Sequence, residues 1–153
     1  MIDLLKKSRI FEGLEESVLK KIAGFSKLET HKSEVTLITE DSDDNYDLFI
    51  LVKGRVKIFV SSKFFGDDAE TKKEVYTVAQ GENFGEMSSV VKKRRSASAV
   101  TVSESEVIRI DGKKFSSFIS KDRDSGFEIL KRICESLYDR IENSNFMLRN
   151  FLI

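Results

Sequence analysis

The middle of the chain, from about residue 34 to residue 110, consists of short apolar runs separated by charged or glycine-bearing turns. The runs are rich in Val, Ile, Phe and Thr, which favour strands, and Lys53-Gly54 between two of them is typical of a tight turn. The candidate strands cover residues 35–39, 48–52, 55–60, 74–78, 97–102 and 107–110. So many short strands predict a sandwich or a roll. The polar segment 61–73 is expected to be a flexible hairpin loop.

Apolar residues at helical spacing flank this middle part on both sides. Before it, the segment from Leu4 to Leu28 predicts a short turn and one helix, which Glu15 or Ser17 would open. After Asp111, a first helical piece precedes a second one in which apolar residues follow alternating steps of three and four. The residues of this second pattern are Phe127, Leu130, Cys134, Leu137 and Ile141. The pattern is a heptad seam, which packs against another helix or along its own domain, and we expect Cys134 to be a buried thiol there.

The length of 153 residues predicts a single domain over residues 1–153. We expect helices over residues 1–28, a strand-rich part over 29–111 and helices again over 112–153. Lys plus Arg equals Asp plus Glu at 26 each, which predicts binding neither to DNA nor to a membrane. The single Cys134, the absence of a signal-peptide pattern and the absence of a long apolar run predict a cytoplasmic protein.

Catalytic and metal-binding residues are scarce. His31 is the only histidine and Cys134 the only cysteine, so the sequence offers no histidine-based triad and no zinc cluster. We therefore expect no enzyme, no metal and no cofactor. The basic run 92–95 has an alternative interpretation as a nucleic-acid patch, although a solvated loop suits it better. The acidic stretch 40–44 lacks the central glycine and the closing glutamate of a calcium loop.

The segment 81–98 carries the residues of a phosphate-and-sugar site. Gly85 allows a close backbone approach, a short helical turn follows it, and Glu86 stands nine residues before Arg95. Amides that open a helix favour an anion, and an arginine grips phosphate oxygens through two parallel charged hydrogen bonds. A glutamate accepts hydrogen bonds from sugar hydroxyls.

These residues resemble the phosphate-binding cassette of the cyclic-nucleotide-binding domain, the module of protein kinase A regulatory subunits and the catabolite activator protein. The resemblance covers nearly residues 5 to 145 and implies a mainly β fold, a β-roll of the double-stranded β-helix or jelly-roll type with flanking helices. Three positions depart from the family pattern: Arg94 stands where proline is usual, and Ser33 and Ser42 stand where glycines are usual. Arg94 also offers a second guanidinium, which leaves the register of the phosphate contact open by one residue.

The resemblance also implies a role for each residue of the cassette. Glu86 would accept the ribose 2′-hydroxyl, Arg95 would pair with the cyclic phosphate, and Ser96 would add a hydroxyl contact. The implied ligand-binding residues are Phe84, Gly85, Glu86, Met87, Ser88, Arg95, Ser96 and Ala97. Ser96-Ala97 fits cyclic AMP and cyclic GMP, with cyclic AMP favoured.

The implied function is that of a stand-alone sensor in which the last helix moves to cover the base. Phe127 and Tyr138 are candidates for contacting that base. The output would pass to an unknown protein partner or to a homodimer through Leu130, Leu137 and Ile141. The alternative is a domain of the same fold that has lost its ligand and serves as an interaction or dimerisation module. An enzyme that acts on cyclic nucleotides is a third option, which the lack of metal ligands disfavours.

Overall fold

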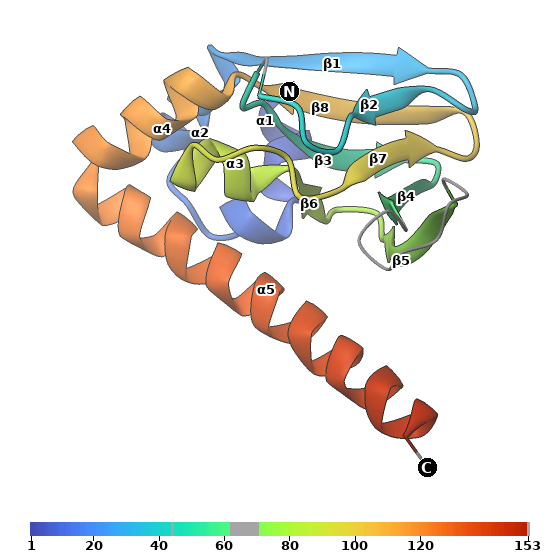
Figure 1. The fold of residues 1–153 in the computed structure, drawn as a ribbon. Coiled ribbons are helices and arrows are strands. Elements are labelled where there is room, and N and C mark those ends of the chain that lie inside the picture. Colours follow the sequence, from blue (N-terminus) through green and yellow to red (C-terminus); the bar gives the residue numbers. More distant parts are fainter. Residues whose placement is uncertain (44, 62–70, 153) are drawn as a thin grey trace.

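Two four-stranded antiparallel sheets form the centre of the computed structural model, which describes residues 1–43, 45–61 and 71–152 (Figure 1). The strand orders are β1-β8-β3-β6 and β2-β7-β4-β5. The strands of the first sheet are β1 (Ser26–His31), β8 (Ser105–Ile110), β3 (Leu48–Lys53) and β6 (Asn83–Phe84). Those of the second are β2 (Thr36–Ile38), β7 (Ser98–Thr101), β4 (Val56–Ser61) and β5 (Lys72–Val78). This arrangement confirms the predicted β-roll, whereas residues 62–70 of the expected hairpin loop lie outside the described residues.

Among the described residues, helices precede the roll, interrupt it between β6 and β7, and follow it (Figure 1). The N-terminal elements are α1 (Ile2–Lys6), the 3-10 helix η1 (Arg9–Phe11) and α2 (Glu16–Ala23). The later helices are α3 (Glu86–Val91), α4 (Gly112–Lys121) and α5 (Arg123–Phe151). None of the helices in the described part of the chain combines the length and the apolar character that crossing a membrane requires.

The core consists of two apolar layers that share strand β3. Leu48 and Ile50 face the helices, where they pack in a cluster with residues such as Phe11 and Phe115. Phe49 and Leu51 point the other way, into the space between the two sheets. Alternate residues of one strand therefore serve both layers, which explains why β3 is apolar from Leu48 to Val52.

The predicted turn at Lys53-Gly54 is confirmed, since β3 ends at Lys53 and β4 begins at Val56. Gly54 has a φ of 93°, a left-handed conformation that a residue with a Cβ adopts at a cost. A Cβ at this position would also meet the backbone of Glu104 and Ser105. Glycine is therefore required by both the turn and the close approach.

Three features differ from the sequence expectations. The chain enters the roll at Ser26, so the segment expected to be helical up to residue 28 already forms strand β1 there. The two-residue strand β6 was not expected either. Cys134 is exposed rather than buried, because the side of α5 that packs on the body carries Gly126, Ile129, Ile133 and Ser136. The buried stripe thus lies one residue away from the predicted seam.

Helix α5 has a packed half and a projecting half. Its buried residues end at Ser136, and residues 141–150 are all exposed. In Figure 1 the C-terminal half of α5 extends away from the roll. The projecting half carries large exposed apolar side chains: Ile141, Phe146, Met147, Leu148 and Phe151.

Candidate functional site

The corner between β6 and α3 is built around Gly85. Phe84 is 2% exposed and stacks on Phe49, with ring centroids 5.2 Å apart, so it anchors the corner between the sheets. Gly85 follows with a φ of 77°. A Cβ on Gly85 would lie 2.6 Å from Cδ1 of Ile38 and 3.1 Å from Nη1 of Arg95. Glycine is therefore what lets this backbone approach the arginine.

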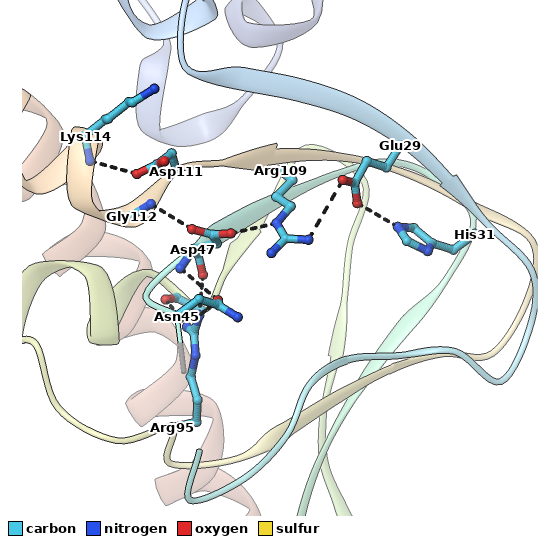
Figure 2. Close-up of polar contacts among 10 residues, drawn as sticks. Glu29, His31, Asn45, Asp47, Arg95, Arg109, Asp111, Gly112 and Lys114 are labelled. Carbon is cyan, nitrogen blue, oxygen red and sulfur yellow. Dashed lines mark hydrogen bonds and ion pairs between the residues drawn. The ribbon is translucent and has the colours of Figure 1, made fainter. Parts of the chain in front are cut away.

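Arg95 lies inside the molecule, where it is 5% exposed. Its Nη1 donates to the carbonyl oxygen of Gly85 at 2.8 Å, and its Nη2 donates to Oδ1 of Asn45 at 3.0 Å and to the carbonyl oxygen of Asp47 at 2.7 Å. Figure 2 shows this guanidinium beneath the segment that carries Asn45 and Asp47. Arg95 therefore ties the segment before β3 to the corner at Gly85.

The side chain of Arg94, unlike that of Arg95, lies at the surface. Its Nη1 lies 3.4 Å from Oδ1 of Asp41 in an ion pair whose two side chains are both mostly exposed. The backbone holds the register, because Arg95 N donates to Ser42 O at 3.0 Å and Asp41 N donates to Arg95 O at 2.8 Å. Of the two guanidinium groups that the sequence left open, only that of Arg95 is buried at the corner.

Asp47 connects Arg95 to the start of α4 and to strand β8 (Figure 2). Its Oδ1 accepts from Gly112 N at 3.0 Å, and its Oδ2 accepts from Nε of Arg109 at 2.6 Å. Nη1 of Arg109 lies 3.9 Å from Oε1 of Glu29. The other carboxylate oxygen, Oε2 of Glu29, is 3.0 Å from Nε2 of His31. His31, the lone histidine, thus ends a polar chain, and the described residues contain no cluster of three metal-ligating side chains.

Glu86 is a nearly buried carboxylate, 2% exposed, in the first turn of α3. Nη1 of Arg140 on α5 donates to its Oε1 at 3.2 Å, whereas Oε2 is buried and has no hydrogen-bond partner among the described residues. Nη2 of Arg140 donates to the carbonyl oxygen of Asn83, and the guanidinium lies 4.9 Å from the ring centroid of Tyr76. Arg140 therefore joins α5 to the site.

A cavity of about 160 Å³ lies between the roll, the corner and α5. Its walls comprise Ile38, Ile58, Phe84, Gly85, Glu86, Met87, Ser88, Arg95, Ser96, Ala97, Ser98, Ala99, Leu137 and Arg140. All eight residues of the predicted site are among them. Phe127 and Tyr138, the candidates for contacting a base, are not, and they are 66% and 60% exposed.

Arg140 is the residue that the sequence analysis missed. It arrives from a helix far along the chain, and its place depends on how α5 packs. One signal was present: the buried stripe Gly126, Ile129, Ile133 and Ser136 continues at helical spacing to Arg140. The sequence prediction followed the neighbouring apolar seam and gave Arg140 no role in the site.

Tyr76 extends the polar contacts at the rim. Its hydroxyl donates to Oε2 of Glu82 at 2.6 Å, and that same oxygen accepts from Ala79 N at 2.9 Å. Partial burial, followed by the hydrogen bond to Glu82, raises the pKa of Tyr76 above the usual value for tyrosine. The ring therefore stays neutral and offers its face to Arg140.

Comparison with protein families gives a match to the cyclic nucleotide-binding domain over residues 28–122, which is more than half of the chain. No match was found among proteins of curated function.

Solved structures share the fold. The regulatory domain of Toxoplasma gondii protein kinase A, crystallised with cAMP, is 21% identical with a TM-score of 0.65, over 76% of this chain and 42% of that one. The catabolite activator protein of Thermus thermophilus is 19% identical with a TM-score of 0.72, over 94% and 63%. The regulatory subunit of a cAMP-independent protein kinase A from Trypanosoma brucei is 17% identical with a TM-score of 0.71, over 88% and 46%. The chain thus spans less than two thirds of the length of each of these proteins.

Proposed function

The chain belongs to the cyclic nucleotide-binding domain family, and on that premise we propose that it is a non-enzymatic cytoplasmic sensor that binds a cyclic nucleotide in the cavity beside Glu86 and Arg95. The observation that carries this proposal is the buried Oε2 of Glu86 on the wall of that cavity, which finds no hydrogen-bond donor in the described part of the chain. A buried carboxylate oxygen without a donor is unfavourable, and a ribose hydroxyl would supply the donor.

The phosphate would lie at the corner formed by Gly85 and Arg95. The guanidinium of Arg95 brings a positive charge to a site with little exposure to water, where a charged hydrogen bond to an anion is strong. The short helix α3 starts at the same corner, with Ser88 nearly buried in the cavity wall. Ser96 and Ala97 complete the cradle on the other side. We retain cyclic AMP as the favoured ligand over cyclic GMP, by the family's pattern at Ser96-Ala97.

The experiment that tests ligand binding replaces Glu86 with Gln and titrates cyclic AMP and cyclic GMP. Loss of the charged hydrogen bond is expected to weaken binding by about tenfold or more. Glu128→Gln is the matched control, since Glu128 is an exposed carboxylate on α5. Equal affinities of the Glu86 variant, the control and the unmodified chain would rule out Glu86 as the ribose contact.

The output would pass through α5, whose position responds to the ligand. The predicted seam Leu130, Leu137 and Ile141 lies beside the packed stripe, and Ile141 is 59% exposed. The heptad positions recur at Leu148 and Phe151, with the polar Ser144 between Ile141 and Leu148, and these two residues are 58% and 86% exposed. A second copy of α5 would cover this apolar face in a coiled coil, as heptad seams do.

The second candidate is an interaction module of the same fold that no longer binds a nucleotide. The exposed apolar residues Ile141, Leu148 and Phe151 of α5 favour it, because such a surface needs a partner whether or not a ligand binds. One solved relative is described as cAMP-independent, so the fold occurs without a response to cyclic AMP. A folded chain that dimerises through α5 and binds no cyclic nucleotide would select this candidate.

A further inference from the structure

Helix α5 supplies one wall of the cavity through Leu137 and Arg140. The cavity holds about 160 Å³, whereas ligand pockets of proteins usually hold about 300–1,000 Å³. A cyclic nucleotide therefore needs more space than this arrangement leaves. The walls that come from the roll are held by strand pairing, as in β4 and β7. The wall that can move outward to enlarge the cavity is the one formed by α5.

Arg140 also binds the carboxylate of Glu86, which the nucleotide would need. It donates to Oε1 of Glu86 at 3.2 Å and lies over the Tyr76 ring, so it neutralises the buried carboxylate in the absence of a ligand. A ribose that takes both carboxylate oxygens, or a base placed against Tyr76, would meet the guanidinium. The same positions therefore suit either Arg140 or the nucleotide.

The contacts that hold α5 at this point are mostly polar and incompletely satisfied. The last fully buried apolar residue of α5 is Ile133; beyond it the half-buried Leu137 packs on the core, Asp139 pairs with the half-buried Arg9, and Arg140 reaches Glu86. Asn83, whose carbonyl accepts from Arg140, is 0% exposed, and both polar atoms of its side-chain amide lack hydrogen-bond partners among the described residues. A buried amide without partners lowers the stability of the packed arrangement. The C-terminal half of α5 can therefore leave at a modest free-energy cost.

We propose that Arg140 is an internal latch, which competes with the nucleotide for Glu86 and holds α5 in a position that lowers the affinity for ligand. The inference rests on the proposed function, because it assigns the regulation of the same cavity. If the unlatched state is a minor one, populated at about 10% or less, the apparent dissociation constant is raised about tenfold or more. Binding then pulls α5 out of its latched position, and this release is the signal.

The test is the affinity of the Arg140→Ala variant for cyclic AMP and cyclic GMP, measured by titration calorimetry beside the unmodified chain. The expected result is a dissociation constant about tenfold lower in the variant. Arg149→Ala is the matched control, since Arg149 is an exposed arginine on the projecting half of α5 and its loss should leave the affinity unchanged. Arg140→Lys keeps the charge but has fewer donors. Its dissociation constant should lie between those of Arg140→Ala and the unmodified chain.

Hydrogen exchange without ligand gives a second readout that does not depend on binding. Loss of the latch should speed exchange in α5 after Ser136 and leave the strands of the roll unchanged. A variant that binds more weakly than the unmodified chain, or that exchanges at the same rate in α5, overturns the latch while leaving the sensor intact. Absence of binding by the chain and by every Arg140 variant overturns the proposed function itself.

Discussion

The buried Arg95 has a structural role and a proposed ligand-binding role, and a single substitution removes both. Its guanidinium bonds to Gly85, Asn45 and Asp47 within the protein, and it also faces the proposed phosphate site. A loss of stability alone therefore does not separate a structural arginine from one that binds ligand. The separation requires that stability and affinity be measured on the same variants.

Replacing Arg95 with Ala removes the donor to the carbonyl oxygens of Gly85 and Asp47, whereas Oδ1 of Asn45 still accepts from Asp47 N at 3.2 Å. We expect the free energy of unfolding to fall by about 2–4 kcal/mol and the affinity for a cyclic nucleotide to fall by about a hundredfold or more. Denaturant titration and calorimetry check the two effects. The control is Arg94→Ala, whose exposed pair with Asp41 contributes at most about 1 kcal/mol. Equal denaturation midpoints for the two variants would show that the contacts of Arg95 do not stabilise the fold.

The raised pKa of Tyr76 predicts a pH dependence. Because the folded state favours the neutral phenol, its stabilisation is complete below the pKa of unfolded tyrosine, about 10, and is lost as the pH rises through the higher folded pKa. Tyr76→Phe removes this contribution. Denaturation measured at pH 8 and above pH 10 should therefore show a smaller loss of stability in the variant than in the unmodified chain. An identical loss in both would contradict the assignment to Tyr76.

At the scale of elements, the sequence predicted strand β3, in which apolar residues dominate, and missed strand β1, in which they do not. Strand β3 is buried on both faces and was plain in the sequence. Strand β1 has polar residues such as Lys27 and Thr30 at exposed positions, and even Leu28 is 44% exposed, so tertiary pairing with β8 rather than composition defines it.

The seam on α5 shows the same limit. The heptad spacing from Phe127 to Ile141 was correctly seen as one face of a helix, yet the body packs on the adjacent stripe. Periodicity finds a helix face but does not say which partner covers it. That is why Cys134 was wrongly predicted to be buried and why Arg140 was not expected in the site.

Neighbouring positions on α5 test this packing directly. Ile133 is 3% exposed in the helix-facing core, so Ile133→Ala should lower the free energy of unfolding by about 2–5 kcal/mol. Cys134→Ala should change it by about 0.5 kcal/mol or less, because its side chain is exposed. Urea denaturation measures both. Comparable losses for the two variants would mean that α5 is rotated from the orientation described.

At the scale of the whole molecule, a sensor domain needs a surface through which ligand binding changes its interaction with a partner. The projecting half of α5 is our candidate for that surface. Cys134 lies on the seam and serves as a native probe. In a parallel, in-register dimer the two Cys134 residues would face each other at a separation that a disulfide spans. Mild oxidation should then yield a cross-linked dimer, which Ile141→Asp should prevent. A chain that remains monomeric at high concentration and does not cross-link would exclude this dimer.

Sensing by this chain depends on the proposed binding of a cyclic nucleotide in the cavity beside Glu86 and Arg95. Its most direct test is isothermal titration calorimetry of the purified chain, shown to carry no nucleotide, against cyclic AMP and cyclic GMP, with 5′-AMP as the control for the cyclic phosphate. We expect binding of a cyclic form, more tightly for cyclic AMP, and none of 5′-AMP. No heat with either cyclic nucleotide, for the unmodified chain and for Arg140→Ala alike, would contradict it.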